Sequence, residues 1–239
     1  MYKRVLLKLS GEALRDERNN LTIDADGLLG LNKTVKELHD NGVEVAIVIG
    51  AGNIWRGKLA KLVNIEPVPA DFMGMLGTVI NAVAMASSLR NQGVDAVVYS
   101  AVPAIDGVTL PYDKDAANKS LSEGKVVFLA GGTGKPFFTT DTAAALRALE
   151  LNCQAIFMGK NGVDGIYTAD PDSDPNAEFI KTISFAEILK RKLQVMDLSA
   201  VELIKNTNID VRVFSMADPA NFLKVANGED IGTTVNKGE

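Results

Sequence analysis

The sequence predicts an α/β protein, built as a three-layer αβα sandwich with a mostly parallel central sheet. Apolar runs of strand length recur along the chain and are continuous rather than alternating, as in strands that are covered on both faces. Helical segments lie between these runs, so strands and helices alternate. A chain of 239 residues is within the range of a single α/β domain, and we expect residues 1–239 to form one domain.

Six apolar runs are predicted to be strands. In chain order they are Val5 to Leu9, Val43 to Ile49, Ala96 to Tyr99, Val126 to Ala130, Ala155 to Met158 and Val211 to Phe214. Met75 to Ala86 and Ala143 to Leu151 are predicted to be helices. A further helix is expected to end at Gly42, with the single histidine, His39, on its surface. Asp170 to Ala177, with two prolines, is predicted to be a surface loop.

Composition and charge exclude several classes of protein. The 25 Lys and Arg residues against 30 Asp and Glu give a net charge of −5, which offers no field to attract nucleic acid or an anionic membrane. Cys153 is the one cysteine, so an internal disulfide is excluded and a reducing compartment fits. The apolar run in Met1 to Gly11 is too short for a signal peptide or a membrane span. We therefore expect a cytoplasmic protein without nucleic-acid or membrane partners.

Three glycine-rich stretches follow predicted strands: Lys8 to Gly11, Gly50 to Gly57 and Gly131 to Lys135. Ligands of parallel sheets bind beyond the carboxyl ends of the strands. Glycine lets backbone N–H groups approach a phosphate closely. Each stretch alone is also compatible with an ordinary turn, but together they could form one phosphate pocket, with Lys8, Arg56 and Lys135 neutralising charge. The dinucleotide and P-loop motifs are not matched, because Trp55 and Pro136 break them.

Two aspartates each allow two interpretations. Asp141 and Asp71 could both be helix caps. Alternatively, Asp141 could orient Lys8 or a water molecule on magnesium, and Asp71 could accept hydrogen bonds from ribose hydroxyls. Three methionines are interpreted as core or subunit-contact residues: Met73, Met75 and Met85.

Motifs spread over nearly the whole chain carry a family resemblance. One set comprises Lys8 to Ala13, the Asn53 to Gly57 loop and Val163 to Pro171, and a second comprises Asp71 to Leu76 with Thr78 and Asn81, and Gly132 to Asp141. The first set resembles the amino-acid kinase superfamily in general, and aspartate and glutamate kinases carry strings similar to Val163 to Pro171. The second set closely resembles the acceptor site of the bacterial uridylate (UMP) kinases.

This resemblance implies an amino-acid kinase-like fold and an enzyme that transfers the γ-phosphoryl group of ATP, used with Mg²⁺, to UMP. It implies contacts to ATP from Lys8, Ser10, Gly11, Gly52, Arg56, Asn161, Tyr167 and Asp170, the last three near the adenine. It implies contacts to UMP from Ala51, Asp71, Thr133, Gly134, Lys135, Pro136, Phe137, Phe138, Thr139 and Thr140. Lys8 and Arg56 would stabilise charge, and Asp141 would orient Lys8 or a magnesium-bound water. No cluster of metal ligands from the protein is expected.

The resemblance also implies homohexamers built as trimers of dimers and UTP as a feedback inhibitor. GTP activation stays open, because Arg15 to Leu21 lacks the glycines associated with it in many relatives. Ala51 replaces a usual glycine, which we expect UMP binding to tolerate. Lys135 replaces a common asparagine, and its charge could face UMP or solvent. Activity on CMP or dCMP is not determined by the sequence.

Two alternatives stay open at the level of sequence. The first is another kinase of the same superfamily, acting on an amino-acid carboxylate or on carbamate. The second is a nucleotide sensor that binds through the same loops without catalysis. The products formed from a panel of acceptors would separate the three possibilities.

Overall fold

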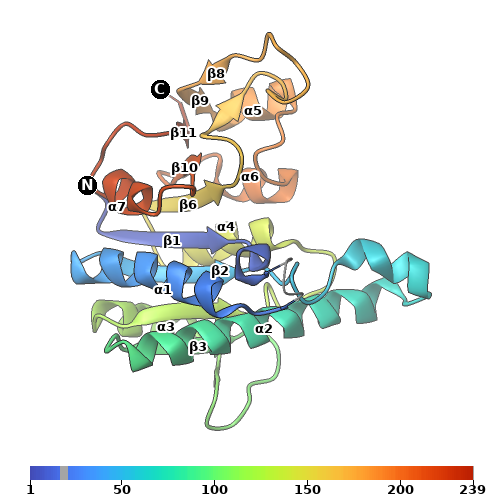
Figure 1. Ribbon diagram of the computed structural model, residues 1–239, viewed down its shortest axis with the longest axis vertical. Helices are drawn as coiled ribbons and strands as arrows, with labels where there is room; N and C mark the ends of the chain where they lie inside the picture. Colours follow the sequence, from blue (N-terminus) through green and yellow to red (C-terminus); the bar gives the residue numbers. More distant parts are fainter. Residues whose placement is uncertain (17–20, 239) are drawn as a thin grey trace.

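A central nine-stranded sheet organises the molecule (Figure 1). Its strands are β1 (Arg4–Leu9), β2 (Glu44–Ile49), β3 (Ala96–Ser100), β4 (Leu110–Pro111), β5 (Val126–Ala130), β6 (Ala155–Lys160), β9 (Thr182–Ser184), β10 (Asp210–Ser215) and β11 (Thr233–Asn236). They lie in the order β4-β3-β5-β2-β1-β6-β10-β11-β9. The computed structural model describes residues 1–16 and 21–238. Neighbouring strands are parallel, except that β10 and β11 are antiparallel.

Helices cover both faces of this sheet, which confirms the predicted three layers. One face carries α1 (Ala25–Asp40), α2 (Pro67–Asn91) and α7 (Ala220–Ala226), and the other carries α3 (Lys114–Ser122), α4 (Thr140–Glu150), α5 (Phe185–Arg191) and α6 (Leu198–Ile204). Leu7 of β1 packs in the first layer and Leu6 in the second, as expected when successive side chains of a strand point to opposite faces. The antiparallel pair β7 (Ile166–Tyr167) and β8 (Phe179–Ile180) forms a separate small hairpin.

All six predicted strands are present, and their ends differ from the predicted ones by at most two residues. Asp170 to Ala177 forms the expected exposed loop between β7 and β8. The prediction for α2 was wrong at its start: the helix begins at Pro67, so Asp71 lies inside it and is not its cap. Proline is well suited to the first helical position, because the N–H that it lacks would have no partner within the helix there.

The helix α2 is long and apolar enough, by length and composition alone, to cross a membrane. Half of its apolar window is buried inside the protein, and Val79, Met85 and Leu89 belong to the core between α2 and the sheet. The helix therefore serves as a core helix of the sandwich.

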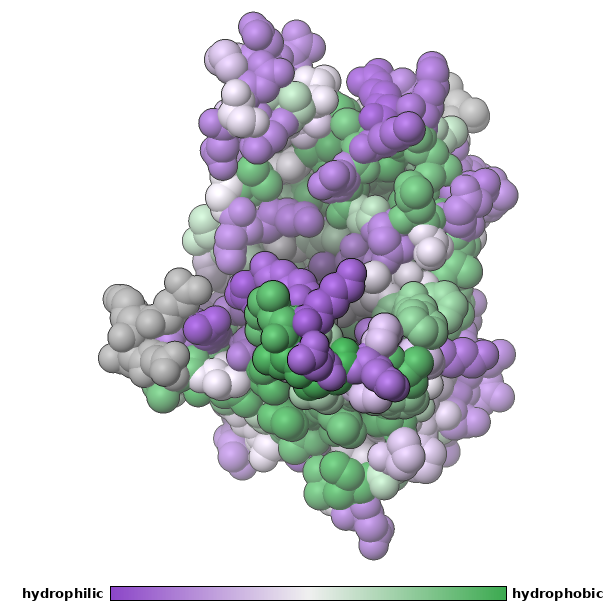
Figure 2. Space-filling view, turned by 90° about the vertical axis from the view of Figure 1, so that its right-hand side faces the viewer, coloured by the Kyte–Doolittle hydropathy of each residue, from purple (hydrophilic) through white to green (hydrophobic). Residues whose placement is uncertain are grey.

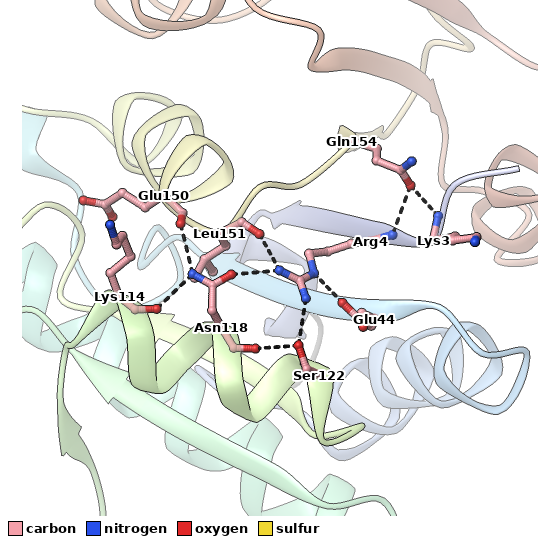
Figure 3. A network of polar contacts seen from close by, with 9 residues as sticks. All are labelled: Lys3, Arg4, Glu44, Lys114, Asn118, Ser122, Glu150, Leu151 and Gln154. Atoms are coloured by element: carbon pink, nitrogen blue, oxygen red, sulfur yellow. Dashed lines mark hydrogen bonds and ion pairs between the residues drawn. The ribbon is translucent and has the colours of Figure 1, made fainter.

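An ion pair and hydrogen bonds connect the amino ends of the central strands to neighbouring helices (Figure 3). Arg4, the first residue of β1, pairs with Glu44 at the start of β2. Its guanidinium also donates to Asn118 Oδ1 and to the carbonyl oxygen of Leu151, each at 2.8 Å, and to Ser122 Oγ at 3.2 Å. These bonds join β1 to β2, α3 and the end of α4 at the edge opposite the glycine-rich loops.

Candidate active site

The glycine-rich loops meet at the carboxyl edge of the sheet, where they enclose a cavity of about 410 Å³. Figure 2 looks onto this side of the molecule and shows a hollow between its upper and lower parts. Eleven of the residues predicted to bind nucleotides line this first cavity: Lys8, Ser10, Gly11, Ala51, Gly52, Asp71, Thr133, Lys135, Phe138, Thr139 and Thr140. Segments far apart in the sequence therefore share one site.

A second cavity, of about 540 Å³, lies against the β7 hairpin and the end of α5. Tyr167 and Asp170, predicted to lie near adenine, both line it. The Tyr167 hydroxyl donates to Asp164 Oδ1 at 2.7 Å, and this hydrogen bond, with burial and the Asp164 charge, raises the pKa of Tyr167. The ring of Tyr167 also makes an edge contact with Phe179, which holds it at the rim of the cavity.

Lys8, which lines the first cavity, forms an ion pair with Asp141. Lys8 Nζ lies 3.0 Å from Asp141 Oδ1, and each side chain is about one-fifth exposed. Asp141 is in the first turn of α4, whereas Thr139 is the cap that accepts hydrogen bonds from the backbone N–H groups of Asp141 and Thr142. The cap interpretation of Asp141 was therefore wrong, and its carboxylate is available to hold Lys8.

Asp197 supports this pair, and sequence reasoning missed it. Its carboxylate accepts hydrogen bonds from the hydroxyls of Thr139 and Thr142, and its backbone N–H donates to Asp141 Oδ2 at 3.3 Å. It also caps α6 by accepting from the Ala200 N–H at 2.7 Å. Asp141 and Asp197 line a third cavity, of about 690 Å³. An acidic residue ahead of a short helix was the one signal in the sequence, and it indicates only a cap.

Arg56 is held by Glu12, a second residue that sequence reasoning missed. Arg56 Nη2 lies 2.7 Å from Glu12 Oε1, and its Nε donates to the Gly52 carbonyl at 3.3 Å. Glu12 lines the first cavity, and Arg56 is joined to it through this ion pair. Gly11 allows the two loops to meet, because a Cβ at Gly11 would lie 2.3 Å from the Gly50 carbonyl oxygen.

The loop after β5 crosses toward α2. The Phe137 N–H donates to Asp71 Oδ2 at 2.7 Å, and Phe137 has a φ of 70°, which is uncommon for a residue with a side chain. Gly134 has a φ of +77°, and a Cβ there would lie 2.6 Å from the Ala101 carbonyl oxygen. Arg147 of α4 donates to the Gly132 carbonyl at 3.2 Å. The loop is thus hydrogen-bonded to α2 and α4, and it packs closely against Ala101 after β3.

Ala51 and Trp55 form the wall of the first cavity next to α2. The Cβ of Ala51 lies where Gly77 has no side chain, since a Cβ built on Gly77 would be only 2.8 Å away. The methyl group of Ala51 is therefore accommodated by the helix. Trp55 Nε1 donates to the Ala70 carbonyl at 2.9 Å, which fixes the indole in this wall.

Other predicted residues lie outside the two cavity linings. Gly134, Pro136 and Phe137 belong to the acceptor loop but are not among the residues that line either cavity, and Asn161 lies in an exposed turn after β6. Residues 17–20 of the segment Arg15 to Leu21 lie outside the described residues. Within the described part of the chain, no group of three or more His, Cys, Asp or Glu residues is placed to hold a metal ion.

Lys160, the last residue of β6, is a third site residue that sequence reasoning missed. It lines the second cavity beside Tyr167 and Asp170. Burial lowers the pKa of the Lys160 ammonium, the positive charge of Lys8 lowers it further, and Asp141 acts in the opposite direction. Lys160 therefore lies near both members of the Lys8–Asp141 pair.

The three-layer fold and the glycine-rich site together define one class of α/β protein. Residues 3–215 match the model of the amino acid kinase family, and the chain belongs to that family.

Within this class the chain is similar to solved structures along its whole length. It is 36% identical to a UMP kinase from Bacillus anthracis (TM-score 0.95, covering 100% of this chain and 97% of that one). It is 35% identical to a UMP kinase from Ureaplasma parvum (TM-score 0.92, 99% and 100%). It is 28% identical to a uridylate kinase from Archaeoglobus fulgidus (TM-score 0.74, 98% and 100%).

Proposed function

We propose that this protein is a UMP kinase, which transfers the γ-phosphoryl group of ATP to UMP and gives UDP and ADP in pyrimidine nucleotide biosynthesis. The observation that carries this function is the full-length similarity to two solved UMP kinases at 35–36% identity. The site supports it, because two cavities are lined by the segments whose motifs resemble the acceptor and donor sites of such enzymes.

The first cavity is proposed to hold UMP. Asp71 lies in its wall and would accept hydrogen bonds from the ribose hydroxyls. The segment Thr133 to Thr140 would surround the base and phosphate, with its backbone fixed as described above. Ala51 would lie beside the acceptor phosphate, and Lys135 lines the same cavity, so its charge is available to an anionic ligand.

The second cavity is proposed to hold the adenosine part of ATP. Tyr167 and Asp170 line it, and Asn161 directly follows β6. The phosphates would extend from there to Lys8, Ser10 and Gly11, which line the first cavity. Backbone N–H groups of the Gly52 loop and the Arg56 guanidinium would complete the contacts.

Positioned charges perform the reaction in this proposal. The phosphate of UMP has a second pKa of about 6 and is largely dianionic at neutral pH, so no general base is needed. Phosphoryl transfer chiefly requires alignment of donor and acceptor and neutralisation of charge on the transferred oxygens. Lys8 and Arg56 supply positive charge. Asp141 keeps Lys8 in place through the 3.0 Å ion pair.

Magnesium fits this site as an ion that arrives with ATP. Mg²⁺ keeps several waters and usually uses one or two carboxylates together with substrate phosphates. Asp141 and Asp197 lie side by side and Asp141 contacts Lys8, so carboxylate oxygens are near the first cavity although the described residues form no metal-binding cluster. The ion would neutralise charge on the phosphate oxygens, and Asp141 could accept a hydrogen bond from one of its waters.

Assembly and regulation belong to the same proposal. We propose a homohexamer, a trimer of dimers, located in the cytoplasm and inhibited by UTP. The outer side of α2 supports an interface between subunits, because exposed apolar side chains form a stripe along it: Phe72, Met73, Leu76 and Ile80. We name these four residues the α2 stripe. No nucleic-acid or membrane partner is proposed.

A panel of acceptors tests the function. The purified protein is incubated with Mg·ATP and one acceptor at a time, and products are separated by chromatography. UDP formed from UMP at rates far above those with glutamate, aspartate or carbamate is the expected result, with CMP and dCMP included to measure side activity. Phosphorylation of an amino acid or carbamate instead of UMP would contradict the proposal. Binding of UMP and ATP in calorimetry without any UDP would identify a sensor.

A further inference from the structure

Lys160 lies on the same face of the sheet as Lys8. In the parallel ladder between β1 and β6, Lys8 is opposite Met158. Side chains of a strand alternate between faces, so Lys160, two residues beyond Met158, points to the same side. This is the face covered by α4, which carries Asp141 in its first turn. Lys160 is therefore placed on the strand next to Lys8, one step nearer the edge where the ligands bind.

The surroundings of Lys160 leave its charge without a carboxylate partner. Lys8 is paired with Asp141 and Arg56 with Glu12. Among the residues that the structure describes, no carboxylate lies within ion-pair distance of Lys160, although its side chain is partly buried. Burying a charge is costly unless a partner compensates for it. A bound anion would supply that partner.

Lys160 also lies near residues of both cavities. It lines the second cavity, where Tyr167 and Asp170 are found, and it adjoins Lys8, which lines the first. A triphosphate that extends from the second cavity to Lys8 reaches Lys160 before its terminal phosphate reaches Lys8. The phosphate that falls at Lys160 is then an inner one.

We propose that the Lys160 ammonium binds the β-phosphate of the donor nucleotide and stabilises the charge that builds up there during transfer. This inference rests on the proposed function in taking ATP as the donor. The bond between the γ-phosphorus and the β–γ bridging oxygen breaks, and its electron pair stays on ADP. An oxygen of the UMP phosphate forms the new bond to phosphorus. Lys160 keeps its proton throughout and acts by charge and hydrogen bonding.

Affinities for ADP and AMP test this role, because AMP lacks the β-phosphate. The variants are Lys160→Met, which removes the charge at similar length, Lys160→Arg, which keeps it, and the control Lys33→Met, on the exposed side of α1. Calorimetry is expected to show ADP affinity reduced about tenfold or more in Lys160→Met and AMP affinity changed less than about twofold. Lys160→Arg should recover part of the loss, and Lys33→Met should bind like the wild type. UDP formation should fall at least about tenfold in Lys160→Met.

Three outcomes would overturn the inference. One is unchanged ADP affinity in a folded Lys160→Met protein. Another is an equal loss of ADP and AMP affinity, which would place Lys160 in support of the adenosine pocket. The third is a loss in Lys160→Arg as large as in Lys160→Met. Lys160→Gln replaces Lys160→Met if thermal unfolding shows that the latter does not fold. Absence of UDP with the wild-type protein would reject the proposed function, whereas the comparison of ADP with AMP would still decide on Lys160.

Discussion

Lys8 shows how much a single residue of this site depends on its partner. Its side chain leaves the end of β1, and Asp141 fixes it from the first turn of α4 at 3.0 Å. Both side chains are only about one-fifth exposed, so the pair is less screened by water than a surface ion pair. A lysine held in this way can face developing charge without reorganising, which is the condition for effective electrostatic stabilisation.

Replacing Lys8 is therefore expected to impair chemistry more than folding. Lys8→Met should lower kcat for UDP formation by about 10²–10³, the scale on which loss of one transition-state charge partner acts. Lys33→Met, which removes a lysine from the surface of α1, should leave kcat unchanged. Steady-state kinetics with UMP and ATP measure both. A folded Lys8→Met protein with kcat within about twofold of the wild type would show that Lys8 has no such role.

Cys153 gives a prediction on pH and accessibility. Burial raises the pKa of its thiol to about 12, and the side chain is buried. From about pH 9 upward the unfolded thiol ionises while the folded one keeps its proton, so stability should fall as pH rises through this range. At pH 8 the native protein should react with a disulfide reagent at least about a thousandfold more slowly than the denatured protein. Absorbance of the released thiolate measures both rates. Similar rates in the two states would contradict this burial.

Residue types and spacing could indicate part of the site and not the rest. Lys8, the glycines and the segment Thr133 to Thr140 follow strands, and parallel strands bring their carboxyl ends to one edge. Asp197 could not be inferred in this way, because it lies 56 residues from Asp141 and its role depends on a contact between α4 and α6. Glu12 and Lys160 were missed for the same reason: their meaning comes from distances to Arg56 and Lys8.

Among the elements, α2 is adapted to the loop that follows β2. Gly77 of α2 leaves the space that the Ala51 methyl group fills, and the two Cβ positions would be 2.8 Å apart. The sequence alone does not connect Ala51 with Gly77, because the glycine is 26 positions further along and on another element. This packing lets the loop after β2 lie close against α2 beside the cavity.

A double-mutant cycle tests this fit between loop and helix. Gly77→Ala should destabilise the wild type by about 1–3 kcal/mol through overpacking against Ala51. In the Ala51→Gly background the same change should instead stabilise by up to about 1 kcal/mol, since alanine is the better helix former. Urea unfolding measures all four proteins.

Gly74→Ala is the matched control for this cycle. Its added Cβ would meet only the Trp55 ring at 3.8 Å, an ordinary contact, so it should stabilise in both backgrounds. If Gly77→Ala has the same sign with and without the Ala51 methyl group, the packing argument is wrong.

Elements whose own residues form an apolar run were predictable, and elements that form only by pairing with other strands were not. The six long apolar runs identified β1, β2, β3, β5, β6 and β10. The strands β4 and β9 have two and three residues and carry no periodic signal of their own. β11 has two threonines and an asparagine around Val235, and it becomes a strand by pairing antiparallel with β10 and parallel with β9. The central position of β1, between β2 and β6, also had to come from the structure.

At the scale of the whole molecule, the α2 stripe is the exposed apolar surface that we expect another subunit to cover. Leu76 and Ile80 are 55% and 52% exposed, one helical turn apart, on a helix whose other side is in the core. Contiguous apolar surface of this kind usually mediates association. A second copy of the chain can cover the stripe with its own stripe, as two-fold interfaces do.

A charge in the stripe is expected to break the assembly. Light scattering after size-exclusion chromatography should give six 25.5 kDa chains per particle for the wild type and fewer for Ile80→Glu, because burying an unpaired carboxylate opposes association. Leu29→Glu, at an exposed leucine of α1, is the control and should keep the full mass. A wild-type monomer, or full assembly in Ile80→Glu, would contradict the proposed interface.

Trp55 gives the protein an optical probe of its own. It is the one tryptophan in the sequence, and its indole is anchored to the Ala70 carbonyl in the wall of the first cavity. Fluorescence excited at the red edge of the spectrum therefore comes from a single known place. Titration with UMP should shift or quench this emission, so occupancy of that cavity can be followed in the unlabelled protein and separated from occupancy of the cavity beside Tyr167.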